Sequence, residues 1–385
     1  MASIKQRPDG RWRARYRDSS GKEHARHFAL KRDAQRWLNE VTASVVTGQY
    51  VAPRAGRITF REYADTWLKS QVHRDSTADL YGNHLTRHAY PTLGDMPLES
   101  ILPTTIQGWV KSLTIADPDR RRAALAPATV GVVYTVVASV FRAAVRDRKL
   151  ASTPCDDIAL PHVVKSRVMP LTTDQVDVLA DTIPTELRAL VILAAGTGMR
   201  QGEVLGLTRD RLRLLGKNPA VTVDRQLVTK AGGETAFAPP KTPASMRKIP
   251  LPRVVIAALN EHIARHDTGP TDLLFVWHGK PLTRQRFGHL WRPAAVAAGL
   301  TSETGTGMHA LRHYYASLLI RYGESVKTVQ DRLGHKSATE TLDTYGHMWA
   351  DSDDRTREAV DSVLGNRAGS ADSLRTVESI APGNH

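Results

Sequence analysis

Cysteine is almost absent from this chain, since Cys155 is the only one in 385 residues. A single thiol cannot form an intrachain disulfide, so a reducing compartment is expected and the fold must rely on its apolar cores. The first residues also lack the apolar run of a signal peptide, which favours a cytoplasmic location. Together the two absences argue against a secreted, disulfide-stabilised protein.

Long hydrophobic runs are also scarce. One uncharged stretch, residues 123–141, is long enough to be mistaken for a membrane span, but Pro127 divides it. What remains is shorter than the roughly 20 apolar residues that a span requires. We therefore expect a buried helix here, and no membrane partner.

Acidic residues are outnumbered by basic ones. The 53 Lys and Arg against 39 Asp and Glu give a net charge of +14 and a pI near 10.0. This balance favours a polyanionic partner, because each phosphate that is neutralised releases condensed counterions. Charge alone would fit RNA, heparin or an acidic membrane equally well, so the choice among them depends on the chemistry of the site.

The length of the chain and its 41% hydrophobic content indicate two or three compact units with apolar cores. Residues 1–50 carry eleven basic and five acidic residues, a net charge of +6. Basic and aromatic side chains alternate over residues 11–17, which predicts a strand with its arginines on one face. A turn at 19–22, a second strand at 24–30 and an amphipathic helix at 31–46 are expected to follow.

A small sheet with an arginine face, backed by a helix, suits a DNA groove. A solvated basic face is the plainer interpretation of the same pattern. The DNA-binding candidates in this segment are Arg11, Arg13, Arg15 and Arg17.

The sequence pattern of residues 58–156 predicts a helical domain. After a linker at 51–57, Thr59 is placed to cap a helix with apolar residues at helical spacing. Further helices are expected at 76–88, 103–113 and 127–148. No residue of this domain suggests chemistry of its own. A second linker is expected at 157–170.

The sequence pattern of residues 169–365 predicts a mixed α/β domain that is mainly helical. We expect helices at 173–182, 186–195 and 252–266, short strands at 221–228, 235–238, 247–251 and 273–276, and more helices from residue 284. The tail, residues 366–385, is rich in Ser, Asp and Gly and is expected to be flexible. The fold class is therefore multidomain α+β: a small N-terminal β-sheet-plus-helix domain, a helical domain and the mixed domain.

Six residues of the mixed domain suit an attack on a phosphodiester. They are Arg200 in Thr-Gly-Met-Arg-Gln-Gly-Glu, Lys241 in Pro-Pro-Lys-Thr, His309 and Arg312 in His-Ala-Leu-Arg-His, His335 in Leu-Gly-His, and Tyr345 in Thr-Leu-Asp-Thr-Tyr-Gly-His. Negative charge grows on the non-bridging oxygens during attack, and preorganised donors stabilise it. The planar fork of arginine contacts two oxygens and stays charged at any working pH.

The reaction also needs a nucleophile and an acid for the leaving group. Tyr345 follows His335 closely enough to reach the same site, and its phenol, with an ordinary pKa near 10, needs help from positive charge. Lys241, between prolines and expected on a hairpin loop, would protonate the departing 5′-hydroxyl. The covalent link retains the phosphodiester energy, so we expect no metal, no cofactor and no ATP.

Each of these residues also has a purely structural interpretation. A lone arginine on a basic protein is usually a surface charge. His309 and His313 at i and i+4 could chelate a metal, but no glutamate follows His309 as the zincin pattern requires. Glu203 is expected either to orient Arg200 or to form a structural ion pair. His313 and its neighbours Tyr314 and Tyr315 read as core or supporting residues.

At these motifs the chain resembles the tyrosine recombinase family, specifically the phage-type integrases. The resemblance implies that Arg200, His309, Arg312 and His335 bind and activate the scissile phosphate, and that Lys241 is the general acid. Lys230 and Lys248 are the fallback candidates for that acid. Tyr345 would form the 3′-phosphotyrosine, in the site of its own subunit.

The resemblance extends to the other domains and to the partners. Residues 58–156 look like a core-binding domain, and residues 1–50 like an arm-binding domain. A homotetramer on double-stranded DNA with core and arm sites, strand exchange through a Holliday junction, a host DNA-bending protein and a recombination directionality factor are implied.

The main alternatives are a plasmid or transposon recombinase or resolvase of the same chemistry, and a type IB topoisomerase. A non-catalytic architectural DNA-binding protein is the alternative outside the enzyme class. The intact set of six residues argues against that last alternative, because a pure binder does not need a positioned tyrosine.

Overall fold

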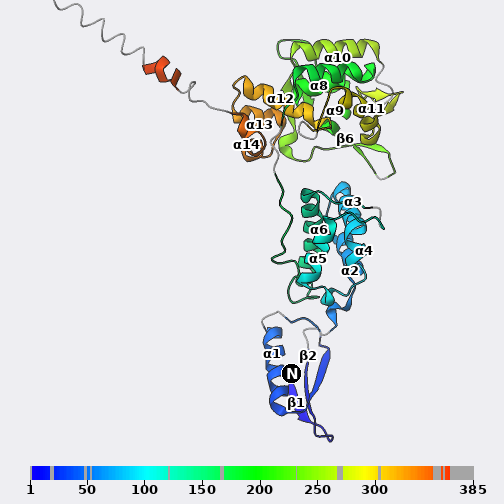
Figure 1. Cartoon of the computed structure of the whole chain (residues 1–385), viewed down its shortest axis with the longest axis vertical. Coiled ribbons are helices and arrows are strands. Elements are labelled where there is room, and N and C mark those ends of the chain that lie inside the picture. The colour runs from blue at the N-terminus through cyan, green and yellow to red at the C-terminus, as the bar shows by residue number, and fades with distance from the viewer. Residues whose placement is uncertain are drawn as a thin grey trace, which may run out of the picture. The chain divides into compact units, whose positions relative to one another are not determined.

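The computed structural model describes residues 2–17, 21–46, 50–52, 54–119, 122–164, 169–230, 232–266, 272–301, 305–349, 357–358 and 360–364. They fall into two compact units, Met1–Val164 and Lys165–His385. The mixed α and β fold class is confirmed, with a small N-terminal sheet, a helical region and a mixed region (Figure 1). The tail expected to be flexible, residues 366–385, lies outside the described residues, as do residues 19 and 20 of the predicted turn.

The N-terminal sheet has three antiparallel strands in the order β1-β2-β3. They are β1 Ser3–Gln6, β2 Trp12–Arg17 and β3 Glu23–Phe28, and helix α1 Lys31–Val46 packs on β2 and β3. Strand β1 was not predicted, because its four residues hold one apolar side chain, Ile4, and show no alternation. The second predicted strand, at 24–30, corresponds to β3, which begins at Glu23 and ends at Phe28.

Strand β2 carries the predicted two-faced pattern. Ala14 and Tyr16 are buried, whereas Arg13, Arg15 and Arg17 are exposed on the other face. Arg11 precedes the strand, so the prediction that it belongs to the strand is wrong. The backbone N–H of Arg11 instead donates to Asp9 Oδ1 at 3.1 Å, in the turn between β1 and β2.

The register places Lys5 of β1 opposite Arg13, which adds a fourth basic residue to that face. Glu23 of β3 lies 3.5 Å from Arg13 Nη2 and 3.8 Å from Arg15 Nη1. We call Lys5, Arg13, Arg15 and Arg17 the basic face.

The helical region is built around apolar helix faces. Its helices are α2 Phe60–Ser70, α3 Asp75–His84, a π-helical turn at Leu85–Ala89, α4 Tyr90–Leu93, α5 Pro103–Leu113 and α6 Pro127–Arg146. Thr59 caps α2 as predicted, with its side chain accepting from the Glu62 amide in a capping box. The helix predicted at 76–88 is confirmed as a helical segment, in which α3 continues into the π-helical turn at Leu85.

Helix α6 is the uncharged stretch singled out above. By length and composition it is the one helix among the described residues that could cross a membrane, but half of its apolar window is buried inside the protein. Phe60, Trp109 and Phe141 share its core. The helix is therefore the core helix of this region, as predicted.

The second unit is mainly helical. Its helices are α7 Thr173–Thr182, α8 Thr185–Thr197, α9 Gln201–Leu205, α10 Arg253–Arg265, α11 Arg284–Ala297, α12 His309–Arg321, α13 Val326–Leu333 and α14 Ala338–Tyr345. The apolar helix α8 contacts α7, α10 and α12 and supplies much of the main core. A smaller core joins α12, α13 and α14 around Tyr315 and Leu333. The two cores meet where α8 and α13 end, and the candidate site lies there.

Three small sheets complete this unit. One sheet has the order β4-β5-β8, with β4 Leu212–Arg213, β5 Ala220–Val223 and β8 Arg247–Pro250. The others are two-stranded, β6 Gln226–Thr229 with β7 Thr235–Ala238, and β9 Val276–Trp277 with β10 Lys280–Pro281.

Two of the predicted strands are wrong. The run 221–228 breaks into β5 and β6 at Asp224, whose carboxylate accepts from Arg211 Nε at 2.8 Å and from Arg225 Nε at 3.1 Å. The run 273–276 is an apolar core segment in which Leu273 forms a single bridge and only Val276 enters a strand. Alternation and apolar content marked burial correctly but not strand pairing.

Candidate active site

Two helix ends present the first pair of candidate residues. Helix α8 is capped by Gly198 at φ +63° and α13 by Gly334 at φ +66°, both in the left-handed region that favours glycine. Each reversal turns the following chain out of its helix. Arg200 thereby becomes the residue before α9, and His335 follows Gly334, the C-cap of α13.

Arg312 lies beneath these helix ends with 2% of its surface exposed. Its Nη1 donates to the Gly198 carbonyl at 2.8 Å and its Nη2 to the Leu333 carbonyl at 2.7 Å. Burial, followed by the charges of Arg200 and Arg247, lowers the pKa of Arg312 to about 9, so it remains a cation at neutral pH. The guanidinium therefore ties α12 to the ends of α8 and α13.

A buried carboxylate neutralises part of this charge. Glu203, 3% exposed, receives Arg200 Nη1 at 3.2 Å and Arg247 Nη2 at 2.9 Å. Burial works to raise the pKa of Glu203, but the charge and hydrogen bonds of Arg247, then those of Arg200, outweigh it and hold the pKa below its usual range. The sequence alone leaves the role of Glu203 open, and Arg247 was not predicted because it lies in none of the recognised motifs.

The two candidate histidines differ in exposure. His309 is exposed on the first turn of α12, whereas His335 is 6% exposed and its Nδ1 lies 2.8 Å from Thr341 Oγ1. Surrounding protein atoms, followed by Arg312, lower the pKa of each to about 4. Both imidazoles are therefore neutral at physiological pH, and they can donate one N–H to an anion.

Tyr345 ends α14 inside the same cluster of its own chain, with 1% of its surface exposed. Its ring stacks on His335 with centroids 6.4 Å apart, and its Oη lies 2.7 Å from His313 Nδ1. Burial raises the pKa of the Tyr345 phenol to about 12, against the pull of Arg312. His313, read above as a supporting residue, thus contacts the tyrosine hydroxyl itself. We call Arg200, His309, Arg312, His335 and Tyr345 the Arg-His-Tyr cluster.

Lys241 is the remaining candidate of the six. It is exposed between β7 and β8, which belong to different sheets, so the prediction that it lies on a hairpin loop is wrong. The next residue, Thr242, lies 3.1 Å by its Oγ1 from Ser245 Oγ, which accepts from Arg200 Nη1 at 3.3 Å. Lys241 is therefore connected to Arg200 through its sequence neighbour Thr242 and two side-chain hydrogen bonds.

The fallback lysines lie elsewhere. Lys230 is at the β6–β7 turn, where its amide donates to the Glu234 carbonyl at 2.8 Å. Lys248 follows Arg247 in β8, so its side chain projects from the opposite face of the strand to the one that meets Glu203.

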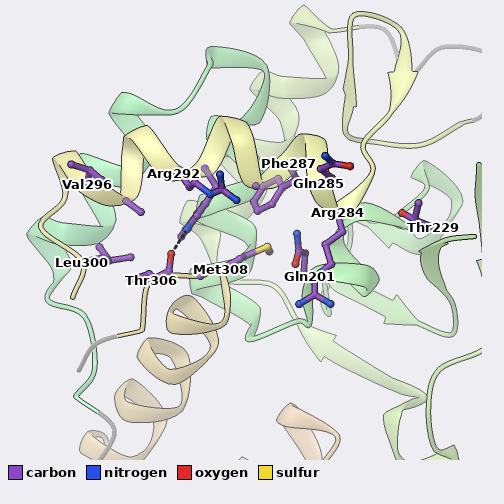
Figure 2. Close-up of a pocket in the computed structure, with 14 residues that line it drawn as sticks. Gln201, Thr229, Arg284, Gln285, Phe287, Arg292, Val296, Leu300, Thr306 and Met308 are labelled. Atoms are coloured by element: carbon purple, nitrogen blue, oxygen red, sulfur yellow. Dashed lines mark hydrogen bonds between the residues drawn. The ribbon is translucent and has the colours of Figure 1, made fainter. Parts of the chain in front are cut away.

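A pocket lies along helix α11 (Figure 2). Helix α11 contributes Arg284, Gln285 and Phe287 to one side, and Gln201 and Met308 line the other. Gln201 follows Arg200 and Met308 precedes His309 in the sequence, so two of the lining residues adjoin phosphate-binding candidates along the chain. Within the part of the chain that the structure describes, no group of three or more His, Cys, Asp or Glu side chains is arranged to hold a metal ion.

Three family models match this chain. The model described as the phage integrase family matches residues 170–351, the phage integrase N-terminal domain matches residues 2–47, and the phage integrase N-terminal SAM-like domain matches residues 59–114. The chain belongs to the phage integrase family. Its members are site-specific tyrosine recombinases, and this chain is one of these enzymes.

Curated relatives support the assignment along nearly the whole length. An integrase of the putative prophage phiRv2 from Mycobacterium tuberculosis is 28% identical over 353 residues, which cover 89% of this chain and 90% of that protein. The integrase of Mycobacterium phage L5 is 26% identical over 349 residues, covering 86% of this chain and 90% of that protein.

Solved structures show the same fold. An integrase of the transposon Tn1549, in complex with a circular intermediate DNA, aligns with a TM-score of 0.66 at 20% identity, covering 80% of this chain and all of that one. A lambda integrase dimer bound to a core site aligns with a TM-score of 0.54 at 20% identity, covering 90% of this chain and 96% of that one. At these identities the likeness concerns the fold alone.

Replacing Glu203 with Gln tests the buried ion pairs of the integrase. A carboxyl with a depressed folded pKa stabilises the fold above its unfolded pKa and loses that contribution as pH falls through the folded pKa. At pH 7 the Glu203→Gln substitution should cost about 3–5 kcal/mol of unfolding free energy, as expected when a buried pair loses one partner. The difference in unfolding free energy between wild type and Glu203→Gln should become smaller below about pH 4.3, the ordinary glutamate pKa.

Urea unfolding of the full chain at pH 7 and at pH 4 measures this difference in unfolding free energy. The exposed Glu324→Gln is the matched control and should leave the midpoint unchanged. An unchanged midpoint in Glu203→Gln at pH 7 would contradict the role given to this carboxylate.

Proposed function

We propose that this integrase cleaves and rejoins DNA strands through a 3′-phosphotyrosine formed by Tyr345, to integrate or excise a mobile element. The observation that carries the proposal is the position of Tyr345, which is buried in its own chain, stacks on His335 and lies within the electrostatic influence of the doubly anchored Arg312. A buried phenol is costly unless it serves packing or chemistry, and its neighbours here are the donors that a phosphate requires.

The four other members of the cluster have complementary tasks. Arg200 and Arg312 supply permanent positive charge at a fixed separation from the nucleophile. His309 and His335 are neutral and would donate one N–H each to a non-bridging oxygen. As the Tyr345 Oη–P bond forms, the P–O5′ bond breaks, so the number of phosphoester bonds is conserved and no ATP is consumed.

Lys241 is the proposed general acid. Its link to Arg200 through Thr242 and Ser245 supports a position near the leaving group once DNA is bound. Lys248 is the least suitable alternative, because its side chain leaves β8 on the other face. Lys230, at the β6–β7 turn, remains the competitor.

A nicked duplex that carries the core site tests the nucleophile, since loss of the short cleaved strand traps the covalent intermediate. Wild type should form an adduct that survives denaturing electrophoresis and resists a metal chelator. Tyr345→Phe should bind the duplex with unchanged affinity and form no adduct. An adduct in the Tyr345→Phe variant would move the nucleophile to another residue.

The three lysines can be separated on the same substrate. Lys241→Ala should slow cleavage by about 10²–10⁴-fold, the usual worth of a general acid, whereas Lys230→Ala and Lys248→Ala should remain near wild type. A substrate with sulfur in place of the 5′-bridging oxygen should restore the Lys241→Ala rate, because a thiol of pKa about 8.5 leaves without a proton. Rescue of Lys230→Ala alone would transfer the role to Lys230.

The N-terminal domain is proposed to bind arm-type DNA sites through its basic face, while residues 58–156 grip the core site. A solved lambda integrase tetramer is bound to a Holliday junction, which supports a homotetramer on two duplexes here. We further propose a host DNA-bending protein, a recombination directionality factor and a cytoplasmic location in a bacterial host.

Deleting residues 1–50 should abolish arm-site binding and integration while core-site cleavage continues. A milder test keeps the domain folded: Arg13→Ala, Arg15→Ala and Arg17→Ala combined should weaken arm binding and reduce its salt slope by up to about 2.7, since each phosphate contact contributes about 0.9. Arg36→Ala on the exposed side of α1 is the control. Equal loss of core cleavage in the deletion would make this segment part of the catalytic fold instead.

A further inference from the structure

The hydroxyl of Tyr345 has one hydrogen-bond partner in the described part of the chain, His313 Nδ1 at 2.7 Å. The two rings meet at 64° with centroids 5.5 Å apart. His313 lies on α12 one turn after His309 and directly after Arg312, so the same helix carries phosphate ligands and this contact. His313 belongs to none of the roles assigned above.

The phenol proton must go to some acceptor when Tyr345 attacks. Burial raises the pKa of Tyr345 to about 12, so at pH 7 only about one phenol in 10⁵ is ionised before attack. Preformed phenolate is therefore scarce, and the proton is best removed while the Oη–P bond forms.

The neighbouring groups differ in their ability to accept that proton. Arg312 is protonated and has no acceptor atom. His335 stacks face to face on the Tyr345 ring, and its Nδ1 is occupied by Thr341 Oγ1. His313 Nδ1 is the nitrogen aligned with the phenol oxygen.

We propose that His313 is the general base that takes the phenol proton of Tyr345 during strand cleavage and returns it during rejoining. In the forward step the Nδ1 lone pair accepts the proton, the Oη–P bond forms and the P–O5′ bond breaks, with the leaving oxygen protonated by the general acid. In the reverse step the 5′-hydroxyl returns its proton to the general acid and attacks phosphorus, the Oη–P bond breaks, and His313 reprotonates Oη. The inference rests on Tyr345 being the nucleophile.

The surroundings of His313 keep it ready to accept. Burial, followed by His309, Arg312 and His335, lowers its pKa to about 4, so the ring is neutral at physiological pH. A scissile phosphate between the arginines would add negative charge to this cationic surrounding, which favours the protonated ring that forms during attack. The acidic residue Glu340 on α14 faces this group of histidines, with its Oε1 3.9 Å from His335 Nε2.

His313→Asn separates a base from a mere anchor. The Asn side chain can keep a hydrogen bond to Oη, because its terminal group occupies the place of Nδ1, but it does not take up a proton. His313→Ala removes both functions. The matched control is His278→Asn, the same replacement at an exposed histidine whose positive φ of 49° asparagine tolerates.

The rate of covalent adduct formation is measured on the nicked duplex with a 5′-bridging sulfur, so that no general acid is needed. Wild type and His278→Asn should show a flat rate from pH 6 to pH 8.5. His313→Asn and His313→Ala should be slower by about 10²-fold or more at pH 7. Their rates should rise about tenfold per pH unit, because each then waits for the free phenolate.

A more acidic nucleophile gives an independent readout. Fluorinated tyrosine at position 345 should restore much of the lost rate in His313→Asn and change wild type little. Thermal unfolding and core-site affinity, measured alongside, should match wild type for His313→Asn.

A His313→Asn rate close to wild type with the same flat pH profile would overturn the inference and leave His313 as a positioning residue. A slow variant whose rate neither rises with pH nor recovers with fluorotyrosine would overturn it as well, since the defect would then be structural. If wild type itself forms no adduct, or Tyr345→Phe forms one, the proposed function fails before this inference is tested.

Discussion

The buried guanidinium of Arg312 is the interaction on which the catalytic domain depends. It donates to the carbonyl oxygens that end α8 and α13, so one charged side chain fixes the two reversals that present Arg200 and His335. A buried cation is expensive unless it is well hydrogen-bonded. The same bonds that satisfy the charge therefore set the geometry of the phosphate site, and the main core and the small C-terminal core meet on either side of it.

Glu203 and Arg247 complete this arrangement from below. Arg247 Nε donates to the Arg332 carbonyl at 2.7 Å while its Nη2 reaches Glu203, so β8 is tied both to α9 and to the end of α13. Glu203 in turn restrains Arg200, whose Nη2 donates to the Gly334 carbonyl at 3.1 Å. The two candidate arginines are thus held before DNA arrives, and little reorganisation is needed when the phosphate binds.

Much of this site could be predicted from the sequence, because its residues sit in motifs with physical meaning. Gly198, two residues before Arg200, and Gly334, directly before His335, indicated helix ends, and the spacing of His309 and Arg312 indicated one helix face. Other features depend on tertiary packing that no local pattern encodes. Nothing near Arg247 announces Glu203 as its partner, and the role of His313 depends on where α14 docks. The break at Asp224 was hidden because β-branched and apolar residues lie on both sides of it, and the Lys241 loop was misread because β7 and β8 follow each other in sequence but belong to different sheets.

Mapping the modified residue by mass spectrometry tests the central claim most directly. The adduct trapped on a nicked duplex is digested with nuclease and trypsin, which should release residues 337–355 as a peptide with Tyr345 as its one tyrosine, whereas Tyr314 and Tyr315 fall in residues 313–321. The account predicts the nucleotide remnant on Tyr345, formed in the presence of a metal chelator. A remnant on residues 313–321, or on any other residue, would contradict it.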